Sequence, residues 1–474
     1  MDQSIRGYLA NLEQQGELVR FRKEVDPLDN LTAIGWKAYD QLGKASLFDN
    51  LKGFPDWQAC NQILIDRKKW GIGLGVAEKD VIETFNARVK DPIHTAIVDP
   101  EHAPVKEIIL KDDDVDLTKV PAAWTSELDP GPFIASGMAI IKDPDTGIRN
   151  MSIHRQQVMG KNRTGYLICP RQALRIYQKY QERNKPMPVA MVVGAHPAIY
   201  FSSSYTAPYG VDELTIAGAL MGEPVRMVKC ETVDLEVPAE AEMVLEGEIP
   251  PDAHTPEGPF GEGSGGYAME GFTQYLDVKC ITRRAKPIFY AMQCGAPMTD
   301  TQALVATAID MLLWEHLKNV EGGLDLLDLR CLGLAGMMAV VVKLRPRVEG
   351  QAKTALMAAL SGPQMHPKLA IAVDEDIDAS DMRQVFWSMT TRVHAERDVI
   401  KIPNARTWSL DNVSDIVPGQ SAMHRIGTKT IVDATKPAVT DPDSRERFAM
   451  AMPKNFESVD LAEFLPDRGT NRDR

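Results

Sequence analysis

Apolar and polar positions in the first 110 residues predict small units of helix and strand. One group of apolar residues recurs at the spacing of an amphipathic helix: Ile5, Tyr8, Leu9 and Leu12. The alternating segment 17–21 that follows is typical of a strand, and the pattern then predicts helices over 31–42 and 76–89. This order of elements predicts an N-terminal α/β unit.

Strand-like runs dominate the middle of the chain. The predicted strands are 133–142, 189–193, 275–282 and 287–292. Two predicted helices, 173–182 and 212–220, interrupt them, and Asp212 is suited to cap the second helix. Many short strands joined by turns that contain Gly and Pro predict a barrel or a sandwich.

Helices and strands alternate again from residue 302. The predicted order is helix 302–317, strand 337–344, helix 351–360, strand 369–373 and helix 380–391. That alternation predicts a second α/β domain at the end of the chain.

The 474 residues are enough for about three domains at roughly 150 residues each. Prolines and acidic residues between 111 and 133 break the periodicity and mark a boundary. The predicted division is an N-terminal α/β domain over 1–115, a central β-rich domain over 116–301 and a C-terminal α/β domain over 302–474. The fold class is therefore α/β, in an α+β multidomain arrangement.

Composition and charge exclude several classes of protein. The chain has 53 Lys and Arg against 66 Asp and Glu, and a net charge of −13 argues against binding nucleic-acid phosphates. The N-terminus lacks the features of a signal peptide, and the longest apolar run is too short to cross a bilayer. We therefore predict a cytoplasmic protein with no membrane or nucleic-acid partner. The six scattered cysteines have no paired spacing, which excludes a zinc ribbon and predicts reduced, buried thiols.

A glycine-rich stretch at 261–266 matches the G-x-G-x-x-G pattern of dinucleotide-binding loops. The pattern has that meaning only where it follows a strand and opens a helix, and here it follows Pro256-Glu257-Gly258-Pro259. The sequence therefore does not predict a dinucleotide site.

The same stretch carries two closely spaced carboxylates, Glu257 and Glu262, on a backbone that is rich in Pro and Gly. Crowding and burial can raise the pKa of one carboxyl into the range of a general acid while the other stays ionised. An ordinary surface loop of Gly and Pro explains the same residues equally well.

A second polar segment, 149–158, favours the catalytic interpretation. If it forms a strand, Asn150, Ser152 and His154 lie on one face and Arg155 on the other. A strand so rich in polar side chains within an otherwise apolar domain is typical of a site, although an edge strand with one wet face remains the alternative.

In these residues and in further motifs the chain resembles the UbiD family of decarboxylases, which use prenylated FMN. The matching motifs run along most of the chain: Asn150-x-Ser152-Ile153-x-Arg155, Pro170-Arg171-Gln172, Asp212-Glu213-x-x-x-Ala217-Gly218-Ala219, Val237-Pro238-Ala239-x-x-Glu242-x-Val244-Leu245-Glu246-Gly247, Pro256-Glu257-Gly258-Pro259-Phe260-Gly261-Glu262, Asp376-Ile377-Asp378 and Trp387-x-x-Thr390-Thr391-Arg392. The resemblance implies that the central domain is a split β-barrel of flavin-reductase type.

For catalysis, the resemblance implies a network of Arg155, Glu257 and Glu262. Glu262 would deliver the proton that replaces carbon dioxide, and Arg155 and Glu257 would orient it and tune its pKa. Prenylated FMN would serve as the electron sink that amino-acid side chains cannot supply.

For the cofactor, the resemblance implies a divalent metal, usually Mn²⁺, that bridges the protein to the cofactor phosphate, and a K⁺ ion beside it. The implied cofactor-binding residues are Asn150, Ser152, Ile153, His154, Arg155, Arg171, Gln172 and Glu213, and the implied metal ligands are Asn150, Gln172, Glu213, Ser203 and Ser204. Gln172 stands where family members commonly carry a histidine ligand. His154 does not occupy a ligand position, and we expect it to be packed and hydrogen-bonded.

The predicted function is reversible, non-oxidative decarboxylation of an aromatic or heteroaromatic acid, such as a hydroxybenzoate, a phthalate-like acid or a CoA-linked acid. An alternative within the family is the polyprenyl-hydroxybenzoate decarboxylase of quinone biosynthesis, and an alternative of another class is a flavin-binding subunit without turnover. The implied partners are a flavin prenyltransferase that supplies the cofactor and further copies of this chain, in a dimer or a hexamer built through the C-terminal domain. Residues near the implied substrate pocket are Thr299, Leu304, Val305, Met365 and His366, and Lys368 lies near the position of a cofactor-directed lysine.

Overall fold

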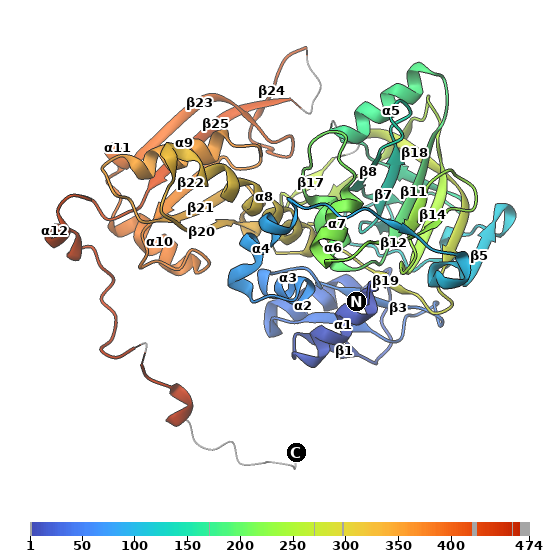
Figure 1. Ribbon diagram of the computed structural model, residues 1–474, viewed down its shortest axis with the longest axis horizontal. Helices are drawn as coiled ribbons and strands as arrows, with labels where there is room; N and C mark the ends of the chain where they lie inside the picture. The colour runs from blue at the N-terminus through green and yellow to red at the C-terminus, as the bar shows by residue number, and fades with distance from the viewer. Residues whose placement is uncertain are drawn as a thin grey trace.

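Three main sheets organise the chain in this computed structural model, which describes residues 2–169, 171–269, 271–295, 298–419, 424–456 and 458–464. In Figure 1 the N-terminal helices and strands lie below the large central sheet, and the C-terminal sheet with its helices lies to one side. The mixed α/β, multidomain fold class is confirmed.

The described residues form these α-helices: α1 (Ile5–Gln14), α2 (Leu31–Leu42), α3 (Arg67–Leu74), α4 (Val81–Arg88), α5 (Gln172–Glu182), α6 (Pro197–Ser204), α7 (Glu213–Met221), α8 (Asp300–Lys318), α9 (Gln351–Ser361), α10 (Met382–Thr391), α11 (Ala395–Asp398) and α12 (Pro442–Glu446). Local chemistry sets several of their ends. Asp212 caps α7 by accepting a hydrogen bond from the Leu214 N–H at 3.0 Å, as predicted. Thr299 and Gln302 form a capping box at the start of α8.

The N-terminal sheet has four strands in the order β1 (Leu18–Phe21), β2 (Ala45–Phe48), β3 (Gln58–Asn61) and β19 (Ile288–Tyr290). The predicted strand 287–292 therefore exists as β19, but it pairs with β3 of this sheet and not with the central strands. The pairing ties the segment after the central sheet to the beginning of the chain.

The central sheet has eight strands, and all its pairs are antiparallel. Its main path is β10 (Arg163–Tyr166), β18 (Gly271–Arg283), β14 (Met243–Ile249), β11 (Met187–Val193), β7 (Met138–Lys142) and β8 (Arg149–Ile153), and β15 (Thr255–Glu257) and β5 (Ile108–Lys111) also pair with β18. Among the described strands the path does not join its two ends, so the predicted barrel is not closed. Smaller sheets flank it: β13 (Glu236–Pro238), β12 (Arg226–Lys229) and β4 (Ala96–Ile97); β16 (Phe260–Gly261) with β17 (Tyr267–Ala268); and β6 (Phe133–Ile134) with β9 (Gln156–Gln157).

The C-terminal sheet mixes parallel and antiparallel pairs. Its order is β20 (Leu326–Cys331), β21 (Ala339–Leu344), β22 (Leu369–Val373), β25 (Arg425–Asp433) and β23 (Val399–Thr407), with β24 (Asp415–Ile416) beside β25. Helix α9 packs against β22 and β25, and α8 packs against β20. Because α8 also contacts α4 and α6, it connects this domain to the rest of the chain.

Several predicted elements differ from the structure in their extent, and local geometry accounts for two of these differences. The predicted helix 76–89 begins only at Val81, because Ala77 is extended and Glu78–Asp80 form a separate 3-10 turn ahead of α4. The predicted strand 133–142 is split into β6 and β7 around Gly137, where a Cβ would overlap the Sδ atom of Met191.

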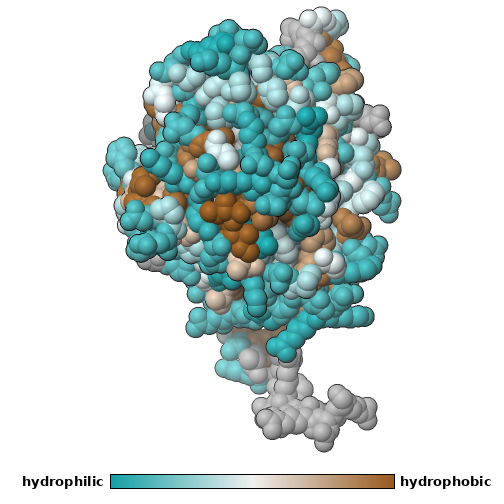
Figure 2. Space-filling model, turned by 90° about the vertical axis from the view of Figure 1, so that its right-hand side faces the viewer, coloured by the Kyte–Doolittle hydropathy of each residue, from teal (hydrophilic) through white to brown (hydrophobic). Residues whose placement is uncertain are grey.

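The visible surface is largely polar (Figure 2), and most of the cysteine thiols are buried. The face in Figure 2 is mostly hydrophilic, with apolar residues gathered in limited patches. No described helix combines the length and the apolar character that crossing a bilayer requires. All six cysteines are free, and four of them are buried, whereas Cys169 is exposed and Cys230 is half-buried, so the prediction of buried thiols is wrong for these two.

Candidate active site

Arg155 lies between the two carboxylates that the sequence analysis singled out. It follows β8, and Glu257 ends β15. Arg155 donates from Nε to Glu257 Oε1 at 3.0 Å and from Nη2 to Glu257 Oε2 at 2.6 Å. Its third nitrogen, Nη1, forms an ion pair with Glu262 Oε1. The structure thus brings together the three predicted catalytic residues from segments about a hundred residues apart.

The network is largely shielded from water. The side chains of Arg155, Glu257 and Glu262 are 11%, 3% and 14% exposed. The Phe260 ring lies 4.7 Å from the guanidinium carbon of Arg155 and packs against Phe133 with ring centroids 4.5 Å apart. Such low exposure strengthens the attraction between the charges and holds the guanidinium in one orientation.

Arg155 binds the two carboxylates differently, so Glu257 and Glu262 can have different roles. Glu257 binds two nitrogens of Arg155 in a bidentate pair, whereas Glu262 binds one and accepts a weaker hydrogen bond from the Gly263 N–H at 3.3 Å. If Glu262 takes up a proton, Arg155 keeps its pair with Glu257 and is not left as an uncompensated charge. The arrangement therefore permits Glu262 to exchange a proton while the pair between Arg155 and Glu257 stays in place.

Asn150 and Glu213, two of the predicted metal ligands, are in direct contact. Asn150 donates from Nδ2 to Glu213 Oε1 at 2.9 Å, and the Met151 N–H donates to Glu213 Oε2 at 2.7 Å. Burial raises the pKa of Glu213 to about 8. The Oδ1 atom of Asn150 is buried and has no hydrogen-bond partner among the residues that the structure describes. A buried carboxylate beside an unpartnered amide oxygen is the environment that a hard, oxygen-binding cation satisfies.

Gln172 lies on the wall of the same small cavity as Asn150. The cavity has a volume of about 10 Å³, close to the space that one water molecule needs. Gln172 donates from Nε2 to the Ala207 carbonyl at 2.7 Å, which leaves its side-chain oxygen as a potential ligand. The described residues contain no group of three or more His, Cys, Asp and Glu side chains that could hold a metal. A metal at this site would therefore depend on amide oxygens.

The predicted K⁺ residues belong to α6, which packs against β8 and α7. The Ser203 hydroxyl is buried and donates to the Tyr200 carbonyl of its own helix at 2.8 Å. Ser204 is half-buried at the end of α6. The hydroxyl oxygens remain available as acceptors.

The remaining predicted cofactor residues surround β8. His154 is buried, with Nδ1 2.8 Å from the Leu167 carbonyl and Nε2 2.8 Å from Ser152 Oγ, and burial lowers its pKa to about 4. It is packed and hydrogen-bonded, as expected. Ile153 is half-buried at the end of β8, and Arg171 is exposed. Pro170 of the matching motif lies outside the described residues.

The residues predicted near the substrate pocket, and Lys368 near the predicted position of a cofactor-directed lysine, have the following surroundings. Thr299 caps α8, and Leu304 lies in the hydrophobic core. Lys368 donates to Asp411 Oδ1 at 2.7 Å, so the described contact directs it to a carboxylate of its own domain. Val305 packs at the edge of the C-terminal core, Met365 is half-buried, and His366 is buried 4.6 Å from the Trp408 ring.

Contacts that the sequence did not indicate join the C-terminal domain to the central one. Arg171 Nη1 and Gln364 Nε2 both donate to Thr206 Oγ1, at 3.4 and 3.1 Å. This contact lies one residue from Ala207, the partner of Gln172. Three segments distant in sequence meet here, and no local pattern could have indicated it.

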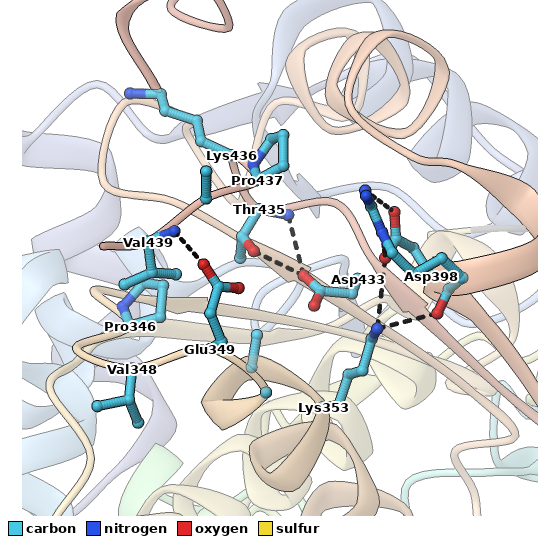
Figure 3. A pocket seen from close by; sticks show the side chains of 14 residues that line it. Pro346, Val348, Glu349, Lys353, Asp398, Asp433, Thr435, Lys436, Pro437 and Val439 are labelled. Carbon is cyan, nitrogen blue, oxygen red and sulfur yellow. Dashed lines mark hydrogen bonds and ion pairs between the residues drawn. The ribbon is translucent and has the colours of Figure 1, made fainter. Parts of the chain in front are cut away.

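A second hollow lies in the C-terminal domain, between the start of α9, α11 and the segment after β25 (Figure 3). Its volume is about 130 Å³. Its charged side chains already have partners: Lys353 donates to Asp398 at 3.3 Å, Thr435 donates to Asp433 at 2.7 Å, and Glu349 accepts from the Val439 N–H. The hollow is remote from β8 and does not contain the chemistry of Arg155 and its carboxylates.

Comparison with known proteins identifies the family to which this chain belongs. Models of the N-terminal, Rift-related and C-terminal domains of 3-octaprenyl-4-hydroxybenzoate carboxy-lyase match residues 9–89, 96–297 and 302–434. The chain belongs to the UbiD family. As a member of this carboxy-lyase family, it resembles the phenolic acid decarboxylase of Sedimentibacter hydroxybenzoicus, with 33% identity over 96% of this chain and 95% of the relative.

Solved structures of UbiD-class enzymes have the same fold. HmfF from Pelotomaculum thermopropionicum in complex with FMN superimposes with a TM-score of 0.89, at 33% identity over 98% of this chain and all of HmfF. An evolved dimeric form of HmfF in complex with prFMN superimposes with a TM-score of 0.84, at 32% identity over the same shares of the chains. The three family models match consecutive parts of this chain, and the UbiD-family motifs named above all lie within the matched residues.

Proposed function

We propose that this chain catalyses the reversible, non-oxidative decarboxylation of an aromatic or heteroaromatic carboxylic acid with prenylated FMN as its cofactor. The observation that carries the proposal is the Arg155 guanidinium shared between Glu257 and Glu262 in a nearly dry site. The relatives support it, because one is a phenolic acid decarboxylase and another is a UbiD-class enzyme in complex with prFMN.

Prenylated FMN supplies, when bound, the electron sink that side chains lack. The residues of this chain transfer one proton and hold one guanidinium group in position. Glu262 transfers a proton to the ring carbon that loses carbon dioxide, and it takes up a proton from solvent before the next turnover. Arg155 fixes the Glu262 carboxyl in position, and Glu257 fixes Arg155 through its bidentate pair.

Asn150, Glu213 and Gln172 would hold a divalent metal, Mn²⁺ in our proposal, that binds the cofactor phosphate. The unpartnered Asn150 oxygen and the buried Glu213 carboxylate fit such an ion. Ser203 and Ser204 on α6 would add a K⁺ site beside β8. We further propose that Ser152, Ile153, His154, Arg155 and Arg171 line the cofactor, and that the open central sheet is a split barrel of flavin-reductase type.

Replacing Asn150 by Ala tests the metal site. We expect the variant to retain several-fold less Mn²⁺ and less flavin after desalting, because one of few oxygen ligands is lost. Metal content by plasma mass spectrometry and flavin absorbance per chain measure the effect. Asn162→Ala, at an exposed position in the loop before β10, is the matched control. Unchanged metal and flavin content in Asn150→Ala would refute the ligand assignment.

The function itself is tested by carbon dioxide release from a panel of acids: hydroxybenzoates, a phthalate, a furoate, a CoA-linked benzoate and a polyprenyl-hydroxybenzoate. The protein is produced with and without a flavin prenyltransferase, the partner that would supply the cofactor. We expect release from at least one small aromatic acid, and only after co-production. Release that does not depend on the prenyltransferase would contradict the cofactor assignment.

Two alternatives remain outcomes of the same panel. The family models carry the description of the octaprenyl-hydroxybenzoate enzyme, so exclusive turnover of the polyprenyl substrate would assign that function. Flavin binding without turnover of any acid would indicate a flavin-binding subunit.

We also propose that the domains divide near residues 115 and 301, that the C-terminal domain assembles dimers or hexamers, and that the protein works in the cytoplasm.

A further inference from the structure

A buried carboxylate outside the matched motifs anchors the loop that carries Glu262. Asp129 is 2% exposed and lies in the turn that precedes β6. Its Oδ1 atom accepts a hydrogen bond from the Gly261 N–H at 3.0 Å. Gly261 is the residue directly before Glu262, so Asp129 holds the backbone from which Glu262 projects.

The turn around Asp129 is itself firmly closed. The Oδ2 atom of Asp129 accepts from Thr125 Oγ1 at 2.6 Å and from the Ser126 N–H at 3.0 Å. A Cβ at Gly261 would overlap Ser126, so this turn lies directly on the Glu262 loop. The Leu128 N–H also donates to the Tyr267 hydroxyl on β17 at 3.4 Å. Two contacts, one to each strand of the β16–β17 hairpin, therefore fix the Glu262 loop in place.

The three groups that point at the Asp129 carboxyl are all donors, and this is the environment of an ionised carboxylate. Burial raises the pKa of Asp129, and its hydrogen bonds and the charge of Arg155 act in the opposite direction. Asp129 is thus a third carboxylate in the field of Arg155, after Glu257 and Glu262.

Two thiols of the described residues also interact with Arg155, Cys294 in the segment after β19 and Cys169 in the segment after β10. Burial raises the pKa of the Cys294 thiol to about 11. Cys294 is therefore neutral at working pH, and the pKa of Cys169 is not lowered below that of an ordinary thiol. Asp129 is bound to the Gly261 N–H, directly before Glu262, so its negative charge adds to that of Glu257 in opposing ionisation of Glu262.

We propose that Asp129 is a positioning residue for Glu262, which anchors the Glu262 loop through Gly261 and keeps the Glu262 carboxyl protonated at higher pH. This inference builds on the proposed function, in which Glu262 is the proton donor. Without the charge of Asp129, Arg155 would hold Glu262 more firmly in its ionised form, and the donor would be lost at lower pH.

The test is an infrared titration of the protein as purified, which needs neither cofactor nor turnover. The carboxyl band that disappears in Glu262→Gln reports the protonation of Glu262. In Asp129→Asn, whose amide oxygen can still accept from Gly261, we expect the midpoint to fall by roughly 0.5–1 pH unit. In the loaded enzyme, the alkaline limb of kcat should move in the same direction by the same amount.

Glu127→Gln is the matched control, because it removes a negative charge two residues away at an exposed position. Its Glu262 midpoint should not move. An unchanged midpoint in Asp129→Asn, or an equal shift in Glu127→Gln, would overturn the inference. If Asp129→Asn does not fold, Asp129→Ser removes the same charge and carries the same expectation. If the enzyme turns over no acid of the substrate panel, the proposed function is refuted. The infrared titration of Glu262 would still decide the role of Asp129.

Discussion

Glu262→Gln should lower the rate of carbon dioxide release by about 10²–10⁴-fold, the contribution typical of a positioned general acid. Glutamine keeps the size of the side chain and can still accept from Arg155, so the loop should keep its shape. It has no proton to deliver to the ring carbon. Initial rates with the best substrate of the panel, in protein produced with the prenyltransferase, measure the loss.

The control for this substitution is Glu182→Gln, which makes the same chemical change at an exposed position near the end of α5. It should retain the full rate. Flavin content must be equal in the two variants, so that a lower rate does not reflect lost cofactor. A Glu262→Gln enzyme that works at the rate of the control would show that another group supplies the proton.

Arg155→Ala should both abolish turnover and destabilise the fold. Glu257 is 3% exposed, and without Arg155 it would be a buried carboxylate with no partner, a defect that costs about 3–5 kcal/mol of unfolding free energy. Arg155→Lys should recover part of the stability, because it restores the charge. It should not recover turnover, because an ammonium group cannot span Glu257 and Glu262 as the planar guanidinium does.

Urea unfolding and carbon dioxide release, measured on the same preparations, separate these two effects. Arg163→Lys is the matched control, since Arg163 forms a comparable but half-exposed pair with Asp277. The control should keep both stability and activity. Substantial turnover in Arg155→Lys would mean that only the positive charge matters, and not the shared geometry.

The pattern of apolar and polar residues correctly predicted those elements whose bounds depend on neighbouring residues in the sequence. The helix 31–42 and the strand 369–373 have the predicted bounds, because one face or one whole run is apolar and the ends carry clear breaks. The strand near 288 was found, but its partner was not, because pairing with β3 joins segments more than two hundred residues apart. Closure of the central sheet depends on the same kind of long-range pairing.

The candidate site shows the same division. Arg155, Glu257 and Glu262 could be predicted because the resemblance covers each of them by motif, and the structure brings all three into contact. Asp129 could not be predicted. Its surroundings, Asp129-Pro130-Gly131, are those of an ordinary turn, and only the fold places its carboxylate against the Gly261 N–H.

Deuterium exchange into the decarboxylated product tests the central claim most directly. The loaded enzyme is incubated with product in D₂O, and label at the ring carbon that would carry the carboxyl group is followed by NMR. We expect the wild type and Glu182→Gln to label this position and Glu262→Gln to label it at least about a hundredfold more slowly. Labelling by Glu262→Gln at the wild-type rate would contradict the assignment of Glu262 as the group that moves the proton.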